Sequence, residues 1–271
     1  MALIVDTNQA SKLPSGGKQD WVLSLSPYVM AEILLRKNPA PTLRLLRTFP
    51  FRLGLETLDI MIQLSTLSAK TIRVFKPFAE AQQRYPEHYR AIADAMNHVR
   101  PTHINWAKYI KKSHRQYMST MLGNARTLRR RLRERGLSNV KHSTFSEALS
   151  EYASDTESFI GSVVVSSITN GGLRPIQTRP DELFEAVMEN QYVGRFFRVK
   201  LAYILSISRV WKDQKLNQDP SPKRDDMTDI TLLFYTGDGD LILSNDNYLS
   251  RLVALIEPKG SVKVCKVQDV V

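Results

Sequence analysis

The stretch VLSLSPYVMAEILLRK, residues 22–37, has the pattern of a short buried strand that passes directly into a helix. Its first five residues are aliphatic residues and serines, Pro27 suits the first helical position, and the segment ends in two basic residues. Strands that alternate with helices build parallel sheets. The stretch therefore predicts an α/β fold and puts Glu32 one to two turns into a helix that follows a strand.

Four other runs of aliphatic and β-branched residues have the length of buried strands. They lie near the two ends of the chain, at residues 3–5, 51–55, 241–244 and 261–267. We therefore expect one central parallel sheet, whose strands come from residues 1–58 and 214–271.

Residues 59–213 have the pattern of a large all-α insertion between the two halves of the sheet. Long segments there repeat apolar residues with the period of amphipathic helices. Helices are predicted at residues 58–75, 86–99, 101–136, 143–172 and 179–212. Gly136 fits the C-cap of the third helix, and Thr144 with Glu147 fits a capping box at the start of the fourth.

The chain is strongly basic, with a formal net charge of +11 and a pI near 9.7, and 42% of its residues are hydrophobic. That content suffices for a buried core, and the charge favours a polyanionic partner, either nucleic acid or an anionic membrane surface. A single cysteine, Cys265, excludes an intramolecular disulfide and a thiolate metal cage, so a reducing compartment is expected. The apolar residues 159–168 are about half of what a bilayer requires. We expect a cytoplasmic protein without a transmembrane helix.

Acidic residues follow predicted strands or begin predicted helices near both ends of the chain. They are Asp6, Glu32, Asp226, Asp229 and Asp246. Residues just past the carboxyl ends of parallel strands share one edge of the sheet, where such folds bind ligands. Each residue alone has a simpler explanation in a turn, a helix cap or a solvated helix face. Their combination predicts a binding site at that edge.

The aspartates near the C-terminus receive two interpretations. Asp226 and Asp229 are three residues apart, so on a helix both face the same side, with Asp225 and Thr228 turned elsewhere. Asp238 and Asp240, in the sequence TGDGD, are interpreted as ordinary turn residues.

Carboxylates held within a few ångströms of one another repel unless a cation neutralises them. Oxygen ligands without histidine or cysteine select hard divalent ions, here Mg²⁺ or Mn²⁺. Such ions activate a water molecule and stabilise charge on phosphorus during in-line hydrolysis. The acidic residues therefore predict metal-dependent hydrolysis of phosphodiester bonds.

Four segments of the chain resemble, in order, the successive motifs of PIN-domain nucleases: LIVDTN (3–8), SLSPYVMAEIL (24–34), DMTDITLLFY (226–235) and LILSNDNYL (241–249). That family consists of metal-dependent ribonucleases and includes many bacterial toxins. The resemblance implies a three-layer α/β/α sandwich. It also implies metal ligation by the acidic residues of the motifs, namely Asp6, Glu32, Asp229 and Asp246, with Asp226 as an added or competing ligand. Asn8 and Ser244 match polar positions that orient the carboxylates and the attacking water.

The resemblance is limited to the two ends of the chain, because compact members of the family lack anything like residues 59–213. It implies a Mg²⁺- or Mn²⁺-dependent ribonuclease, as in a toxin or defence effector. RNA is the expected substrate, and an antitoxin-like inhibitor protein and a second copy of the chain are candidate partners. Two alternatives stay open: a structure-specific DNA nuclease, and a non-catalytic nucleic-acid-binding protein on a PIN scaffold.

Residues 108–141 contain eleven lysines and arginines but one acidic residue, Glu134. Pairing between neighbouring helical turns could not neutralise this excess, so phosphate binding is as well supported as a solvated helix face. The candidate nucleic-acid-binding residues are Lys108, Lys111, Lys112, Arg115, Arg126, Arg129, Arg130, Arg131, Arg133 and Arg135. Tyr109, His114 and Tyr117 could stack on unpaired bases or belong to the core. A basic helix on a membrane surface is the weaker alternative, because no broad apolar face flanks it.

Overall fold

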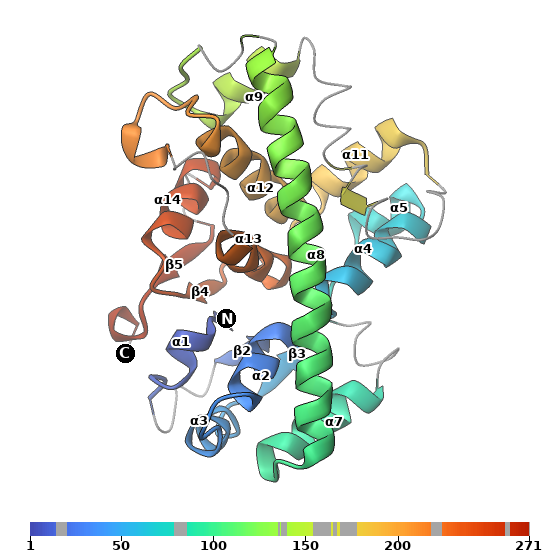
Figure 1. Cartoon of the computed structure of the whole chain (residues 1–271), viewed down its shortest axis with the longest axis vertical. Coiled ribbons are helices and arrows are strands. Elements are labelled where there is room, and N and C mark those ends of the chain that lie inside the picture. Colours follow the sequence, from blue (N-terminus) through green and yellow to red (C-terminus); the bar gives the residue numbers. More distant parts are fainter. Residues whose placement is uncertain are drawn as a thin grey trace.

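The computed structural model describes residues 1–14, 21–78, 86–134, 136, 140–153, 164, 167–168, 178–217, 224–257 and 261–270. In this part of the chain, a parallel five-stranded sheet is surrounded by helices (Figure 1). Its strands are β1 (Ala2–Val5), β2 (Val22–Leu25), β3 (Phe51–Leu53), β4 (Leu241–Leu243) and β5 (Lys263–Cys265). The five predicted strands and the α/β fold with a central parallel sheet are confirmed.

Strand β1 lies in the middle of the sheet, whose order is β3-β2-β1-β4-β5. From β1 the chain steps outward through β2 to β3, and it returns much later on the other side of β1. Ile4 of β1 accordingly pairs with Ser24 of β2 and with Ile242 of β4. The direction of the connections reverses between β1 and β4. Open parallel sheets bind ligands beyond the carboxyl ends of their strands at such a reversal.

Several helices join or follow the strands at the two ends of the chain. They are α1 (Thr7–Ala10), α2 (Pro27–Leu34), α3 (Ala40–Leu46), α13 (Arg224–Thr231), η3 (Leu232–Tyr235), α14 (Asn247–Ile256) and η4 (Val267–Asp269). Helix α2 begins as predicted, because Pro27 occupies its first turn and Ser26 Oγ accepts the backbone N–H groups of Tyr28 and Val29. All four residues of β1 are buried, so both faces of the central strand are covered.

Most of the helical content lies between β3 and β4. The described helices there are α4 (Thr57–Thr66), α5 (Ala69–Arg73), α7 (Pro86–Asn97), α8 (Pro101–Glu134), α9 (Phe145–Ala153), α11 (Pro180–Glu189), α12 (Val193–Ile207) and η2 (Gln214–Leu216). Helix α8 runs down the front of the molecule in Figure 1 and packs against α2, α4, α7, α12 and α13. Buried apolar residues of these helices and of the strands form one continuous core. None of the described helices is both long and apolar enough to cross a membrane.

Two of the predicted helix ends agree with the structure. Gly136 follows α8 in a left-handed conformation, with φ of 71°. Before α9, the Glu147 N–H donates to Thr144 Oγ1 and the Glu147 carboxylate accepts the Thr144 N–H, which confirms the capping box. Beyond Ala153, most of the helix predicted to residue 172 lies outside the described residues.

Two of the predicted helices are each divided in two. The helix predicted at residues 58–75 is interrupted at Ser68, whose side chain caps α5. The helix predicted at residues 179–212 is interrupted at Asn190, whose Oδ1 accepts two backbone N–H groups at the start of α12. The Asn190 Nδ2 donates to the carbonyls of Ile72 and Phe75, near the end of α5. One buried amide thus ends α11, caps α12 and holds both against α5, which the spacing of apolar residues does not indicate.

Asp238 lies in a turn, as predicted, but this turn and the residue after it also fix the amino-terminal edge of the sheet. Asp240 is buried and accepts the N–H groups of Ala2 and Gly237, both at 2.9 Å. Asp238 lies 2.6 Å from the guanidinium of Arg195, a side chain that is only 2% exposed. The interpretation of these aspartates as ordinary turn residues therefore missed their structural contacts.

Lys200, in the middle of α12, generates a prediction about stability. Its Nζ is buried and donates to Ser167 Oγ at 2.5 Å and to Met121 Sδ at 3.2 Å. Burial lowers the pKa of the amine from 10.5 to about 7. Between these two values the unfolded chain binds a proton that the folded chain does not, so this group makes stability rise with pH. The contribution can reach roughly 1.4 kcal/mol per pH unit.

We predict that Lys200→Met stabilises the protein near pH 7 and that this advantage shrinks toward pH 9. The comparison requires urea unfolding of both proteins at pH 7, 8 and 9 in EDTA. Lys263→Met, at an exposed position, serves as the control and should show no such trend. A constant difference between Lys200→Met and the unmodified protein across these pH values would contradict a buried neutral amine.

Candidate metal centre

A cavity of about 230 Å³ lies at the carboxyl ends of β1 and β2. Its lining residues come from the ends of these strands and from α1, α2, α13 and η3: Asp6, Thr7, Asn8, Ser26, Tyr28, Val29, Glu32, Asp225, Thr228, Asp229, Thr231 and Leu232. Four residues singled out from the sequence, Asp6, Asn8, Glu32 and Asp229, are therefore brought together. The cavity stands beside the reversal of the strand order, as the edge position of these residues predicted.

Glu32 enters the cavity from the second turn of α2, and polar groups contact both of its oxygens. Thr7 Oγ1 donates to Oε2 at 2.8 Å, and the Tyr28 hydroxyl donates to Oε1 at 2.8 Å. Lys111 Nζ of α8 lies 3.4 Å from Oε1. Burial alone would raise the pKa of Glu32, but these hydrogen bonds and the charge of Lys111 lower it. Glu32 is therefore ionised at neutral pH and held in a fixed orientation.

Asp6 and Asp246 are connected through Ser244, just beyond β4. Ser244 Oγ donates to Asp6 Oδ2 at 3.4 Å and accepts the Asp246 N–H at 3.1 Å. Asp246 Oδ1 accepts the N–H groups of Tyr248 and Leu249 and so caps α14. Burial raises the pKa of Asp6, although hydrogen bonds from nearby N–H groups and Ser244 oppose it. The hydroxyl of Ser244 thus fixes one aspartate after β1 relative to another after β4.

Asp229 of α13 has the most strongly perturbed carboxyl group at this edge of the sheet. Burial raises its pKa to about 9, and a hydrogen bond with Asp246 and the charges of Asp6, Asp246 and Asp226 act in the same direction. This pKa keeps Asp229 protonated at neutral pH, with its carboxyl group hydrogen-bonded to Asp246. The carboxyl groups are close enough to repel, and here the proton relieves that repulsion.

The face of α13 that lines the cavity differs from the predicted one. Asp226 does not line the cavity, and the hydroxyl of Tyr203 in α12 donates to its Oδ2 at 2.9 Å. Asp225 and Thr228, by contrast, line the cavity together with Asp229. The prediction that Asp225 and Thr228 are turned elsewhere is therefore wrong, because the packing of α13 against α8 and α12 sets its rotation. Asp226 acts on the site through its charge.

Sequence reasoning missed the contact of His114 in α8 with two residues that line the cavity, Tyr28 and Thr228. His114 is buried, stacks on the ring of Tyr28 with centroids 4.0 Å apart, and lies with Nε2 3.3 Å from Thr228 Oγ1. Burial lowers the pKa of His114 to about 4, so the ring is neutral. Tyr117 is also buried, whereas Tyr109 is 63% exposed. Of the three proposed stacking residues, only Tyr109 is accessible to a base.

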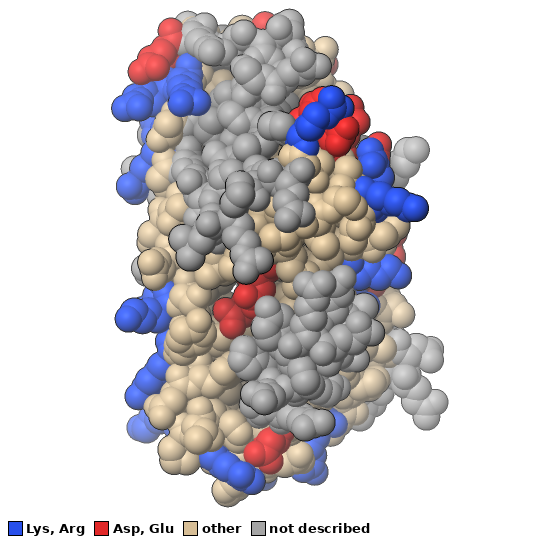
Figure 2. All heavy atoms as spheres, turned by 90° about the vertical axis from the view of Figure 1, so that its right-hand side faces the viewer, with Lys and Arg blue, Asp and Glu red and all other residues tan. Residues whose placement is uncertain are grey.

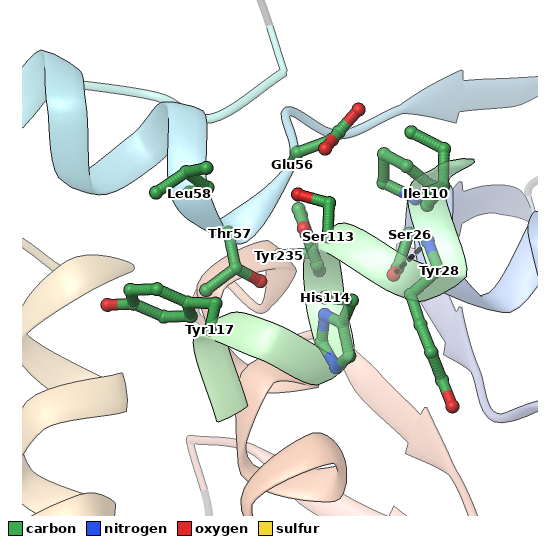
Figure 3. A pocket seen from close by; sticks show the side chains of 11 residues that line it. Ser26, Tyr28, Glu56, Thr57, Leu58, Ile110, Ser113, His114, Tyr117 and Tyr235 are labelled. Carbon is green, nitrogen blue, oxygen red and sulfur yellow. Dashed lines mark hydrogen bonds between the residues drawn. The ribbon is translucent and has the colours of Figure 1, made fainter. Parts of the chain in front are cut away.

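A much smaller cavity of about 10 Å³ shares Ser26 and Tyr28 with the first and has room for about one water molecule. Figure 3 shows His114 of α8 in this region, with Glu56 at the start of α4 above it. Burial and the charge of Asp59 raise the pKa of Glu56 to about 7. Residues of α2, α4 and α8 therefore meet around this small cavity, beside the acidic one.

Among the described residues, no group of three or more His, Cys, Asp or Glu side chains stands ready to hold a metal ion. Glu32 is already engaged by Lys111, 3.4 Å away. The donor chemistry nevertheless fits a hard divalent cation, because every acidic group here offers oxygen. Burial, above all, and the neighbouring negative charges raise the pKa of Asp229. A divalent ion bound by Asp6 and Asp229 would replace the proton on Asp229.

The ten candidate nucleic-acid-binding residues fall into three groups. Lys111 is half-buried against Glu32, and Arg129 is half-buried as well. Arg135 lies outside the described residues. The others are exposed on α8, namely Lys108, Lys112, Arg115, Arg126, Arg130, Arg131 and Arg133.

Comparison with known proteins gives no match: no family model, no curated protein and no solved structure is significantly similar to this chain. The resemblance to PIN-domain nucleases thus depends on the four sequence segments, and the function has to be argued from the cavity itself.

We predict that Asp229→Asn stabilises the metal-free protein and that the gain increases with pH. The unfolded carboxyl group loses its proton near pH 4, whereas the folded one keeps it to about pH 9, so the acid makes stability fall across this window. The asparagine variant lacks this dependence. Urea unfolding at pH 5, 7 and 8.5 in EDTA measures it, with the exposed Asp181→Asn as the control. Equal pH dependence in the unmodified protein and in Asp229→Asn would contradict the proton on Asp229.

Proposed function

We propose that the protein is a Mg²⁺- or Mn²⁺-dependent nuclease with a PIN-like three-layer fold, and that it hydrolyses phosphodiester bonds in RNA in the cytoplasm. One observation carries the proposal: Asp6, Glu32 and Asp229 line one cavity beside the reversal of strand order. Asp246 does not line the cavity, but a hydrogen bond connects it to Asp229. The residues come from segments more than 190 positions apart. The order of the four motifs along the chain supports the same function.

In this proposal Asp6, Asp229 and Asp246 bind the cation, and Glu32 completes the site. A bound divalent ion would lower the pKa of a water molecule and offset charge on the phosphate. Ser244 holds Asp6 and Asp246 in register, while Thr7 and Tyr28 orient Glu32. Asn8 is exposed at the cavity and is suited to hydrogen-bond the water or the phosphate. Asp226 raises the negative charge of the site from behind.

A role as a toxin or defence effector, with an antitoxin-like inhibitor and a second copy of the chain as partners, belongs to the same proposal and derives from the family resemblance. The cavity chemistry is equally suited to a structure-specific DNA nuclease, so the nucleic acid has to be tested directly. Labelled single-stranded RNA, duplex RNA and DNA, each with Mn²⁺ or EDTA, distinguish these activities. Binding without turnover of any of them would favour the non-catalytic alternative.

We predict that Asp6→Asn and Asp246→Asn each reduce Mn²⁺-dependent RNA cleavage at least a hundredfold while the fold stays intact. Asparagine keeps the size of the side chain and is itself a good N-cap residue, so α14 remains capped in the second variant. Cleavage assays with circular dichroism of each variant provide the measurement. Asp181→Asn is the matched control, and full activity in both cavity variants would refute the assignment.

Lys111 leads to a separate prediction about metal affinity. Its ammonium group already offsets the charge of Glu32, so it competes with an added cation. We expect Lys111→Met to bind Mn²⁺ several-fold more tightly in calorimetry without nucleic acid, whereas Lys112→Met, exposed on the next position of α8, should not. Weaker Mn²⁺ binding by Lys111→Met would show that Lys111 supports the site instead of competing for it.

A further inference from the structure

Helix α8 carries two basic triads with the same spacing. The proximal triad is Lys108, Lys112 and Arg115, and the distal triad is Arg126, Arg130 and Arg133. In each triad the residues follow at intervals of four and three, which places them on one face of a helix. The two triads are 18 residues apart, a whole number of turns and about 27 Å along the axis. All six side chains are therefore on the same face, and all six are exposed.

The opposite face of α8 fixes this surface in place. Ala107, Ile110, Met118, Met121, Ala125 and Leu132 are buried in the core, and α8 packs on α2, α4 and α13. The apolar residues therefore face inward and the basic residues face solvent. In Figure 2, where the front of Figure 1 lies to the left, lysine and arginine side chains run down that left edge.

This surface is not an ordinary solvated helix face. Glu134 is the single acidic residue of α8, and it lies 3.8 Å from Arg130 at the far end. Like charges three or four residues apart destabilise a helix, and ordinary exposed helices mix both signs. An anionic chain that contacts both triads would remove this repulsion. An anionic membrane suits the surface less well, because α8 offers no apolar residues on the same face for insertion.

The proximal triad adjoins the acidic cavity. Lys111, in the turn between Lys108 and Lys112, reaches Glu32 inside the cavity. Tyr109, next to Lys108, is 63% exposed and presents an aromatic ring on which an unpaired base can stack. The cavity of about 230 Å³ has room for one phosphodiester group.

We propose that the exposed face of α8 binds single-stranded nucleic acid, whose phosphates contact both triads and one of whose bases stacks on Tyr109. The strand then runs along α8 and ends at the acidic cavity. This deepens the proposed function, since it names the substrate class for that site, but the binding itself requires neither metal nor cleavage. At roughly 3.4 Å per nucleotide of a stacked strand, about eight nucleotides connect the two triads.

The test measures fluorescence anisotropy of labelled oligoadenylate RNA of 4, 8 and 16 nucleotides in EDTA. The distal variant combines Arg126→Gln, Arg130→Gln and Arg133→Gln. The control combines Lys70→Gln, Lys212→Gln and Lys263→Gln, three exposed lysines on other elements with the same change in charge. We expect the distal variant to lose about tenfold or more in affinity for the 16-mer and little for the 4-mer. Its plot of log K against log salt should be shallower by about two.

Tyr109 has its own comparison. Tyr109→Ala should weaken binding about fivefold or more, whereas Tyr109→Phe keeps the aromatic ring and should bind normally. Equal losses in the distal and control variants, or no dependence on length in the unmodified protein, would overturn the proposal. The proposal would also be overturned if the protein bound blunt-ended duplex more tightly than single strands and if Tyr109→Ala did not weaken that binding. If the distal variant lost binding to phosphatidylserine vesicles but kept its affinity for RNA, the surface would be assigned to membranes instead.

The two proposals fail in different ways. Binding is measured in EDTA and cleavage in Mn²⁺, so each proposal is tested without the other. Triad-dependent binding without Mn²⁺-dependent cleavage would leave α8 as a nucleic-acid-binding surface and refute the nuclease. If the distal variant cleaved substrates of every length as the unmodified protein does, the nuclease proposal would stand and the binding surface on α8 would be refuted.

Discussion

The pairing of β1 with β4 is the constraint on which the rest of this structure depends. It joins Ile4 to Ile242 in adjacent parallel strands, although almost the whole chain lies between them. The direction of the connections reverses at this pair, and the cavity lies next to it, at the carboxyl ends of β1 and β2. Asp6 and Ser244 follow these two strands directly, and the hydroxyl of Ser244 donates to Asp6 across the gap. Without this pairing the acidic residues would lie on unrelated loops.

The helices between β3 and β4 complete the site instead of forming a separate unit. Helix α8 packs on α2, which carries Glu32, and on α13, which carries Asp229. The same helix places a cation next to Glu32 and a neutral, buried histidine against Tyr28. Its inner face therefore contacts residues that line the cavity, whereas its outer face carries the two basic triads. One rigid helix thus connects the acidic cavity to an extended cationic surface.

Local sequence signals predicted the elements better than their contacts. All five strands were predicted, because short aliphatic runs flanked by turn residues are specific for buried strands. The breaks at Ser68 and Asn190 were not, since both depend on side-chain hydrogen bonds within otherwise periodic segments. The same difference applies to α13, where the spacing put Asp226 and Asp229 on one side of the helix, whereas Asp225 and Thr228 line the cavity with Asp229 and Asp226 does not.

The sequence by itself determined the α/β class, the positions of the strands and the acidic residues that follow them, because these depend on local composition and on the geometry of parallel sheets. Only the tertiary structure decided how the carboxyl groups interact. Burial and mutual repulsion put a proton on Asp229, Tyr203 holds Asp226 away from the cavity, and Lys111 reaches Glu32 from a helix 79 residues later. Such electrostatic effects depend on distance and solvent exposure in space, which the order of residues along the chain does not contain.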